Sequence, residues 1–171
     1  MLHAIAVSMM LAATPPDDAA ARFVGYWAPD LQSHQRHNEL KESRQGAAIA
    51  PPGGLLYLPK VRVSLNEGAL TFEFLNDDGT LSSSTRVTLD GRESINPRGN
   101  EGRKHVSTSA WKDGVLKTTW KVLQDGATVM NGVDTWALST DGTTLTQTSE
   151  MEDARSRSRT RTIYRRSSRE R

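Results

Sequence analysis

Residues 113–126 read Asp-Gly-Val-Leu-Lys-Thr-Thr-Trp-Lys-Val-Leu-Gln-Asp-Gly. Within them Leu116, Thr118, Trp120 and Val122 alternate with lysine and threonine, and an Asp-Gly pair stands at each end. Successive side chains of a strand point to opposite faces, so this alternation is typical of a strand with one face in water. Glycine readily adopts the positive φ of a tight hairpin turn, and aspartate tolerates it. The segment therefore predicts one strand between two hairpin turns.

The same organisation repeats along the chain on both sides of this segment. Asp-Gly pairs recur at 78–79, 90–91 and 141–142, and Asn66-Glu67-Gly68 is a further turn signal. We predict an all-β protein, an antiparallel up-and-down barrel of about eight to nine strands, because closure protects strand edges. A sandwich is the alternative. The predicted strands lie near residues 23–27, 60–65, 69–75, 81–89, 104–111, 115–122, 128–138, 143–151 and 157–166.

The composition limits the classes of function. The chain of 171 residues contains no cysteine, which excludes disulfides, thiol catalysis and cysteine-ligated metal sites. A hydrophobic content of 36% suits many short strands better than a large helical core. We assign residues 22–166 to one barrel domain and residues 167–171 to a basic tail.

The N-terminal segment resembles an export signal. Residues 4–13 form an apolar run that is too short to span a bilayer, and small residues suited to cleavage follow at Ala12-Ala13 and Ala19-Ala20-Ala21. Only His3 stands where a signal usually carries lysine or arginine. We take residues 1–21 as a signal peptide, which predicts a periplasmic or secreted protein; a short buried helix is the alternative.

Residues 28–58 interrupt the strand pattern and form a long first connection. Asp30 can cap a short helix that continues to Leu40, before the Pro51-Pro52 breaker. On such a helix His34 and His37 could be two metal ligands, but no third ligand at suitable spacing is visible. We therefore predict no metal site and no cofactor.

No residue constellation indicates catalysis. The chain has no Gly-x-Ser-x-Gly elbow and no glycine loop that could hold a phosphate before a helix. Its aspartates and glutamates cluster at hairpin tips, where their role in turns is sufficient. We predict that the protein is not an enzyme.

The last predicted strand sorts its side chains by charge. Arg157, Arg159 and Arg161 share one face, while hydroxyl residues and Tyr164 share the other. A last barrel strand with its charges in water explains this pattern. The alternative is that the three arginines contact an anionic surface or polymer. Nucleic acid is the least favoured partner.

Two motifs resemble those of lipocalins and the wider calycin group, including small bacterial lipocalin-like proteins. They are Gly25-Tyr26-Trp27 and the hairpin from Trp136 to Thr146, which precedes the final strand. The resemblance implies that Gly25 and Trp27 belong to a barrel closure in which a late arginine covers the Trp27 ring. We expect Arg165 in that position, with Arg161 as the alternative; Trp27 could also be simply a core aromatic residue.

The resemblance also implies a ligand site inside the barrel. Fatty-acid-binding relatives hold a carboxylate with an Arg-x-Tyr pair, but here Arg161 and Tyr164 are three residues apart and face opposite ways. Heme-binding barrels use a histidine, for which His105 is the candidate, although a solvent-facing His105 is the favoured interpretation.

We expect a small, partly apolar ligand that contacts Trp111, Trp120, Trp136 and Tyr164, without catalysis. The expected inner face is mixed in character, which suits a hollow barrel and a filled one equally. Its expected members are Val106, Thr108, Ala110, Leu116, Trp120, Val129, Val133, Leu145, Thr160 and Tyr164.

Overall fold

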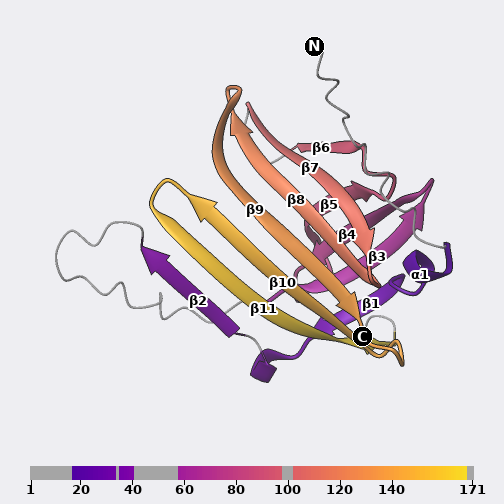
Figure 1. Ribbon diagram of the computed structural model, residues 1–171. Helices are drawn as coiled ribbons and strands as arrows, with labels where there is room; N and C mark the ends of the chain where they lie inside the picture. The colour runs from indigo at the N-terminus through magenta and orange to yellow at the C-terminus, as the bar shows by residue number, and fades with distance from the viewer. Residues whose placement is uncertain (1–16, 34, 41–57, 98–101, 169–171) are drawn as a thin grey trace, which may run out of the picture.

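The computed structural model describes residues 17–33, 35–40, 58–97 and 102–168 (Figure 1). It contains one short helix, one 3-10 turn and eleven strands. In chain order these are α1 (Asp17–Ala21), β1 (Gly25–Pro29), η1 (Leu31–Ser33), β2 (Gln35–Leu40), β3 (Lys60–Asn66), β4 (Ala69–Leu75), β5 (Leu81–Thr88), β6 (Glu93–Pro97), β7 (Arg103–Lys112), β8 (Val115–Gln124), β9 (Ala127–Leu138), β10 (Thr144–Asp153) and β11 (Ser156–Ser167).

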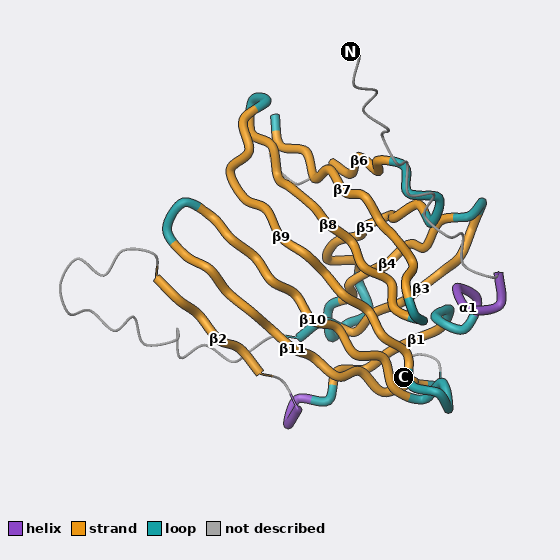
Figure 2. The backbone as a smooth tube through the Cα atoms, in the orientation of Figure 1, coloured by secondary structure: helices purple, strands orange, loops and turns teal. Residues whose placement is uncertain are grey.

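The strands form a single antiparallel sheet that rolls into a nearly closed barrel. Their order is β5-β4-β3-β1-β11-β10-β9-β8-β7-β6, and β2 adds to the free part of β11. Figure 2 shows two walls, one of β7–β11 and one of β3–β5. The ring of Phe72 on β4 stacks on Trp136 of β9, so the two walls face each other across the core. The predicted up-and-down barrel is confirmed, with more strands than expected.

The two ends of the sheet, β5 and β6, are joined through side chains. Asn96 Oδ1 accepts a hydrogen bond from the Arg86 backbone N–H at 3.0 Å, and Asn96 Nδ2 donates one to the Arg86 carbonyl at 3.0 Å. The Thr88 N–H donates to Ser94 Oγ at 3.1 Å. Asn96 and Ser94 therefore replace the backbone ladder at this seam.

The tight turns adopt the predicted backbone. Asp113 and Gly114 have φ of 52° and 76°, and Asp125 and Gly126 have φ of 51° and 85°. Two consecutive residues with positive φ form the turn whose twist matches a two-residue hairpin. These positions explain why the Asp-Gly signal locates the strands correctly.

The prediction of a helix from Asp30 to Leu40 is wrong. Only Leu31–Ser33 is helical, as a 3-10 turn, and Gln35–Leu40 is strand β2. β1 pairs with residues 164–167 of β11, and β2 pairs with residues 156–161 of the same strand. The free backbone edge of β11 thus draws a segment into the sheet that has no alternating apolar pattern of its own. The proposed metal ligand His34 lies outside the described residues.

One end of the barrel is filled by an apolar core, against which α1 packs. Ala20 and Phe23 are each 1% exposed, and the Trp27 indole N–H donates to the Phe23 carbonyl at 2.9 Å. The Phe23 ring also meets Trp111 edge to face, with centroids 5.2 Å apart. Ala20 and Phe23 therefore belong to the packed core at this end of the barrel.

The register of the sheet corrects the expected inner face. On β7 the buried, inward residues are His105, Ser107 and Ser109, whereas Thr108 and Ala110 are exposed. Val106 is buried, but it also faces outward. Its cross-strand neighbours there are Ile95 and Lys121.

Two further members of the expected inner face, both on β9, also face outward. Val129 is 40% exposed, and Val133 pairs with the outward Thr119. The expectation failed because it placed apolar side chains inside, whereas this wall carries polar ones. The members that do face inward are Leu116, Trp120, Leu145, Thr160 and Tyr164.

Candidate functional site

The inward side chains of β7–β11 form rows, because cross-strand partners lie side by side on one face of a sheet. Among the rows that span all five strands, the one nearest the apolar end is Trp111, Leu116, Trp136, Gln147 and Thr162. The next row is entirely polar and consists of Ser109, Thr118, Asp134, Ser149 and Thr160. The third row is Ser107, Trp120, Gly132, Met151 and Ser158. We call the polar members of these three rows, with His105, the polar inner wall.

The polar row is partly satisfied within the protein. Ser109 Oγ and Thr118 Oγ1 lie 2.9 Å apart and share a buried hydrogen bond. Beside this row, the Tyr164 hydroxyl donates to Gln147 Oε1 of the first row at 3.3 Å. Burial, and secondarily the nearby Asp134 carboxylate, raise the pKa of Tyr164 well above its usual value. Tyr164 is therefore a neutral hydrogen-bonding group at any physiological pH.

The third row contains two buried polar atoms that the described residues leave without a hydrogen-bond partner, Ser107 Oγ and Trp120 Nε1. Ser107 is 2% exposed and Trp120 is 7% exposed, and the two residues are cross-strand partners. Gly132 faces Trp120 in this row, and a Cβ there would lie 2.5 Å from an indole carbon. The glycine thus makes room for the indole to lie flat across β9.

The four residues expected to contact a ligand are at different depths. Trp136 stacks between Phe72 and Tyr164, with centroid separations of 4.6 and 6.0 Å. Trp111 packs on Phe23 at the apolar end. Trp120 lies two rows away, with the His105 ring 5.5 Å from its own. The structure thus brings Trp136 and Tyr164 together and leaves Trp111 and Trp120 apart from them.

His105 and Ser107 are the residues that the sequence interpretation missed. His105 is 8% exposed and faces inward, which contradicts the expectation of a solvent-facing side chain. The signal that identifies them is the pairing of β7 with β8, because Leu116, Thr118, Trp120 and Val122 fix which residues of β7 point inward. Hydrophobicity alone misplaces the β7 residues.

The barrel closure uses Arg166 rather than Arg165. The Arg166 guanidinium lies 4.3 Å from the Trp27 ring centroid and donates to the carbonyls of Gly142, Val24 and Arg22 at 2.9, 2.9 and 2.6 Å. Arg165 faces away and donates to Thr144 Oγ1 at 3.0 Å. The reason is parity, since Arg166 shares a face with the inward Tyr164.

The glycine of the Gly25-Tyr26-Trp27 motif has a structural cause. Gly25 has a φ of 141°, which favours glycine, and a Cβ at this position would lie 2.8 Å from Arg166 Nη1. Gly25 therefore provides the space in which Arg166 covers Trp27.

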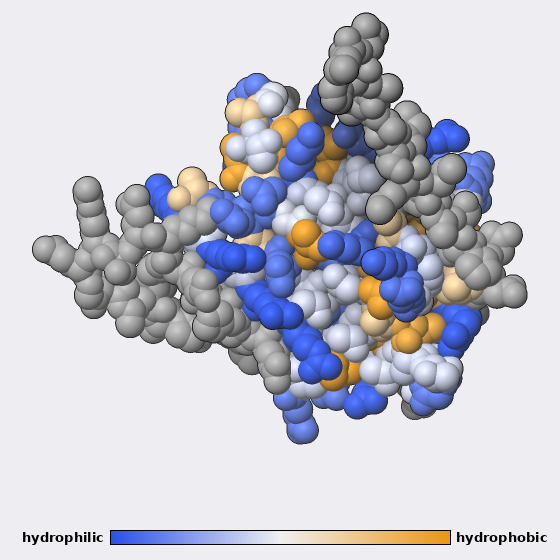
Figure 3. All heavy atoms as spheres, viewed as in Figure 1, coloured by the Kyte–Doolittle hydropathy of each residue, from blue (hydrophilic) through white to orange (hydrophobic). Residues whose placement is uncertain are grey.

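The outward face of β11 carries the arginine stripe, which we define as Arg157, Arg159 and Arg161. All three are exposed, while Ser158, Thr162 and Tyr164 are buried, as predicted. Glu150 lies 3.6 Å from Arg157 Nη2 and 3.5 Å from Arg159 Nε. Figure 3 shows strongly hydrophilic side chains across this face of the molecule, over β10 and β11.

Arg161 and Tyr164 lie on opposite faces of β11. Arg161 is exposed and Tyr164 is 2% exposed, and the register between β10 and β11 is continuous through both. No bulge therefore brings the two side chains together, and the arginine–tyrosine carboxylate clamp does not form from this pair.

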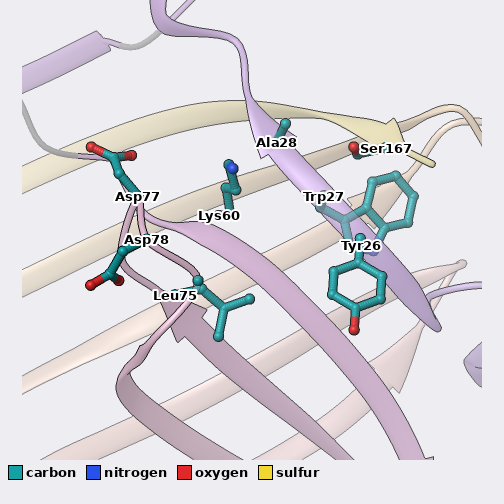
Figure 4. Close-up of a pocket in the computed structure, with 9 residues that line it drawn as sticks. Tyr26, Trp27, Ala28, Lys60, Leu75, Asp77, Asp78 and Ser167 are labelled. Carbon is teal, nitrogen blue, oxygen red and sulfur yellow. The ribbon is translucent and has the colours of Figure 1, made fainter. Parts of the chain in front are cut away.

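A hollow of about 470 Å³ lies beside β1. Figure 4 shows residues that line it. Tyr26, Lys60 and Leu75 line it together with Asp77 and Asp78 of the β4–β5 turn. The two aspartates are exposed, and neither Ser107 nor Trp120 borders this hollow. The polar inner wall is the better-defined candidate, since it holds the buried polar atoms that require a partner.

Within the described ranges, no three histidine, aspartate or glutamate side chains are grouped closely enough to hold a metal ion. No helix in the same part of the chain has the length and hydrophobicity needed to cross a membrane.

Comparison with known proteins gives similarity of fold only. No family model matches the sequence, and no curated protein matches it. Among solved structures, an asparagine-to-alanine mutant of the fluorescent protein UnaG has a TM-score of 0.50 at 16% identity, covering 87% of this chain and 99% of its own. A secretary abundant heat soluble protein from Ramazzottius varieornatus has a TM-score of 0.45 at 13% identity, covering 63% of this chain and 70% of its own. The chain, with its nearly closed antiparallel barrel, has a calycin-like fold.

Proposed function

We propose that this protein binds a small, partly apolar molecule inside the barrel, at the polar inner wall, and that it does so without catalysing a reaction. The observation that supports this most directly is the pair of buried, unpartnered atoms Ser107 Oγ and Trp120 Nε1 within the described residues. A buried polar group without a partner costs about 1–3 kcal/mol. A ligand that supplies the missing hydrogen bonds recovers that free energy, which gives the interior an affinity for it.

The environment of these two atoms suits an amphipathic ligand. Trp120, Val122, Met130 and Met151 offer apolar contact on the same inward face. Methionine adapts its shape to a bound molecule more readily than branched side chains do. Small barrels of this kind can enclose one small ligand.

A titration with N-phenyl-1-naphthylamine, a neutral fluorescent probe, tests the proposal. We expect saturable binding, seen as enhanced probe emission and quenched tryptophan emission. Thr160→Phe places a ring on the inward face and should abolish binding, whereas Thr119→Phe places the same ring on the exposed outer face and should leave it unchanged.

Two results would contradict the proposal. One is the absence of saturable binding by the wild-type protein. The other is strong destabilisation by Thr160→Phe but not by Thr119→Phe, because overpacking of that kind indicates an interior that is already filled.

We further propose that the protein is exported to the periplasm or the exterior, with a cleavage site after Ala13 rather than after Ala21. Cleavage after Ala13 keeps α1 and the buried Ala20 in the mature domain. N-terminal sequencing of the protein recovered from the culture medium or periplasm tests this, and a mature chain that begins at Arg22 would contradict it.

The arginine stripe supports a second candidate function, contact with an anionic surface or polymer. Arg157 and Arg159 each lie near the Glu150 carboxylate, and Arg161 completes a row of three exposed guanidiniums on the outer face of β11. Retention on a polyanion such as heparin, with its dependence on salt, is the measurement that separates this function from ligand binding.

A further inference from the structure

We infer that the ligand of the polar inner wall is an uncharged molecule with a hydrogen-bond acceptor oxygen, such as a ketone, ester, ether or alcohol, and that Trp120 and Ser107 bind this oxygen. The inference rests on the proposed function and specifies the chemical class of its ligand. It follows from the hydrogen-bonding capacity of the two unpartnered groups and from the distribution of charge around them.

The hydrogen-bonding capacity of the pair requires an acceptor. An indole N–H can only donate, so the partner missing at Trp120 Nε1 is an acceptor atom. A serine hydroxyl donates or accepts, so Ser107 can bind the same atom or a neighbouring one. The two residues are directly paired on neighbouring strands and point to the same inward face, so both side chains can contact one bound ligand.

The charge around the pair disfavours an anion. Every lysine and arginine of β7–β11 is exposed, and Arg166 covers Trp27 at the apolar end. Asp134 is the carboxylate that the polar row itself contributes to this inner face. A carboxylate moved from water into such a site loses its hydration without gaining a nearby cation, and its binding is therefore strongly unfavourable.

The hydration free energy that a neutral oxygen loses on burial is much smaller than that of a carboxylate. The two free hydrogen-bonding atoms at Ser107 and Trp120 compensate for that loss, and the rings of Trp120 and His105, with centroids 5.5 Å apart and planes tilted by 32°, are neighbours on the same inward face. A flat, apolar molecule with one carbonyl group matches this combination of a ring surface and a donor.

Three probes of nearly the same shape test the inference. 2-Acetylnaphthalene carries a neutral acceptor, 2-naphthoate carries an anionic one, and 2-ethylnaphthalene carries none. Calorimetric titration at pH 8 should give the ketone at least a tenfold lower Kd than either of the other two. Trp120→Phe keeps an aromatic ring without the donor, and Ser107→Ala removes the hydroxyl. Each variant should reduce the preference of the ketone over 2-ethylnaphthalene several-fold, while Thr119→Ala, on the exposed outer face of β8, should not.

The outcomes separate the inference from the proposed function. Equal or tighter binding of 2-naphthoate overturns the inference, and so does an unchanged ketone preference in both variants. If none of the three probes binds while N-phenyl-1-naphthylamine does, the barrel binds ligands but not through this acceptor site, and the inference fails alone. If no probe binds at all, the proposed function fails.

Discussion

Replacing Ser107 by alanine should stabilise the ligand-free protein. Ser107 is 2% exposed, and its hydroxyl has no hydrogen-bond partner among the described residues. An unsatisfied buried hydroxyl costs about 1–3 kcal/mol, and its removal leaves a void of only one oxygen atom. We therefore expect Ser107→Ala to raise the free energy of unfolding by about 1 kcal/mol, or the Tm by about 2–4 °C for a chain of this size.

Ser109→Ala is the matched control, two residues along the same strand and on the same inward face. Ser109 is 1% exposed, but its hydroxyl shares a 2.9 Å hydrogen bond with Thr118 Oγ1. The substitution removes that bond and leaves the 4% exposed Thr118 hydroxyl without it, which should destabilise the protein by about 2 kcal/mol. The free energies of unfolding of the two serine variants should therefore lie on opposite sides of the wild-type value and differ from each other by about 3 kcal/mol.

Urea unfolding followed by tryptophan emission and by circular dichroism measures both variants. The Ser109→Ala, Thr118→Val double mutant should recover part of the lost stability, because it removes both members of the pair. If Ser107→Ala destabilises the protein as much as Ser109→Ala does, the Ser107 hydroxyl is already satisfied in the free protein. That result would refute the reasoning that an unmet hydrogen bond attracts the ligand.

Three further predictions concern the barrel end, acid and the outer face. Arg166→Ala should lower the free energy of unfolding by about 2 kcal/mol in thermal or urea melts, because it removes three charge-assisted hydrogen bonds and the contact with Trp27. Arg165→Ala should change the same free energy by less than about 0.5 kcal/mol. Equal effects of the two substitutions would contradict the role of Arg166 in the barrel closure. Hydrogen bonds, first from the Ser139 hydroxyl and then from Thr143, lower the pKa of Asp141 from 3.8 to about 2, so this carboxylate stabilises the fold above pH 3.8 and its contribution disappears as the pH falls through 2. The difference in Tm between wild type and Asp141→Ala should be largest at neutral pH and should shrink as the pH falls towards 2. A difference in Tm that does not change with pH would be inconsistent with this. Serine substitution of the whole arginine stripe should lower the salt concentration at which the protein elutes from heparin, and unchanged elution would exclude the anionic-surface function.

The strands could be predicted from the sequence because two independent signals coincide. Alternation and the Asp-Gly turns locate nine of the strands that the structure contains, and the positive φ of Asp113 and Asp125 is the physical basis of the turn signal. β2 and β6 carry neither signal strongly. β2 is a strand because β11 offers it a free edge, which is a property of the assembled sheet rather than of Gln35–Leu40.

The candidate site was only partly predictable for a related reason. Trp120 and Tyr164 are correctly placed inward by alternation, as are the buried hydroxyls of β11. On β7 both faces contain small residues, so hydrophobicity does not distinguish Ser107 and Ser109 from Thr108 and Ala110. Only the pairing with β8 resolves the two faces. Along β11, alternation from the inward Tyr164 places Arg166, and not Arg165, on the inward face over Trp27.

The seam between β5 and β6 makes closure of the barrel depend on two particular side chains. Backbone ladders elsewhere in the sheet persist whichever residues occupy them, whereas Asn96 and Ser94 supply here the atoms that a neighbouring backbone would otherwise provide. Evolution can therefore loosen or tighten the circumference at this joint by point substitution alone. Two barrels with the same strand order can therefore differ in the width of their interior without any insertion, deletion or change of topology.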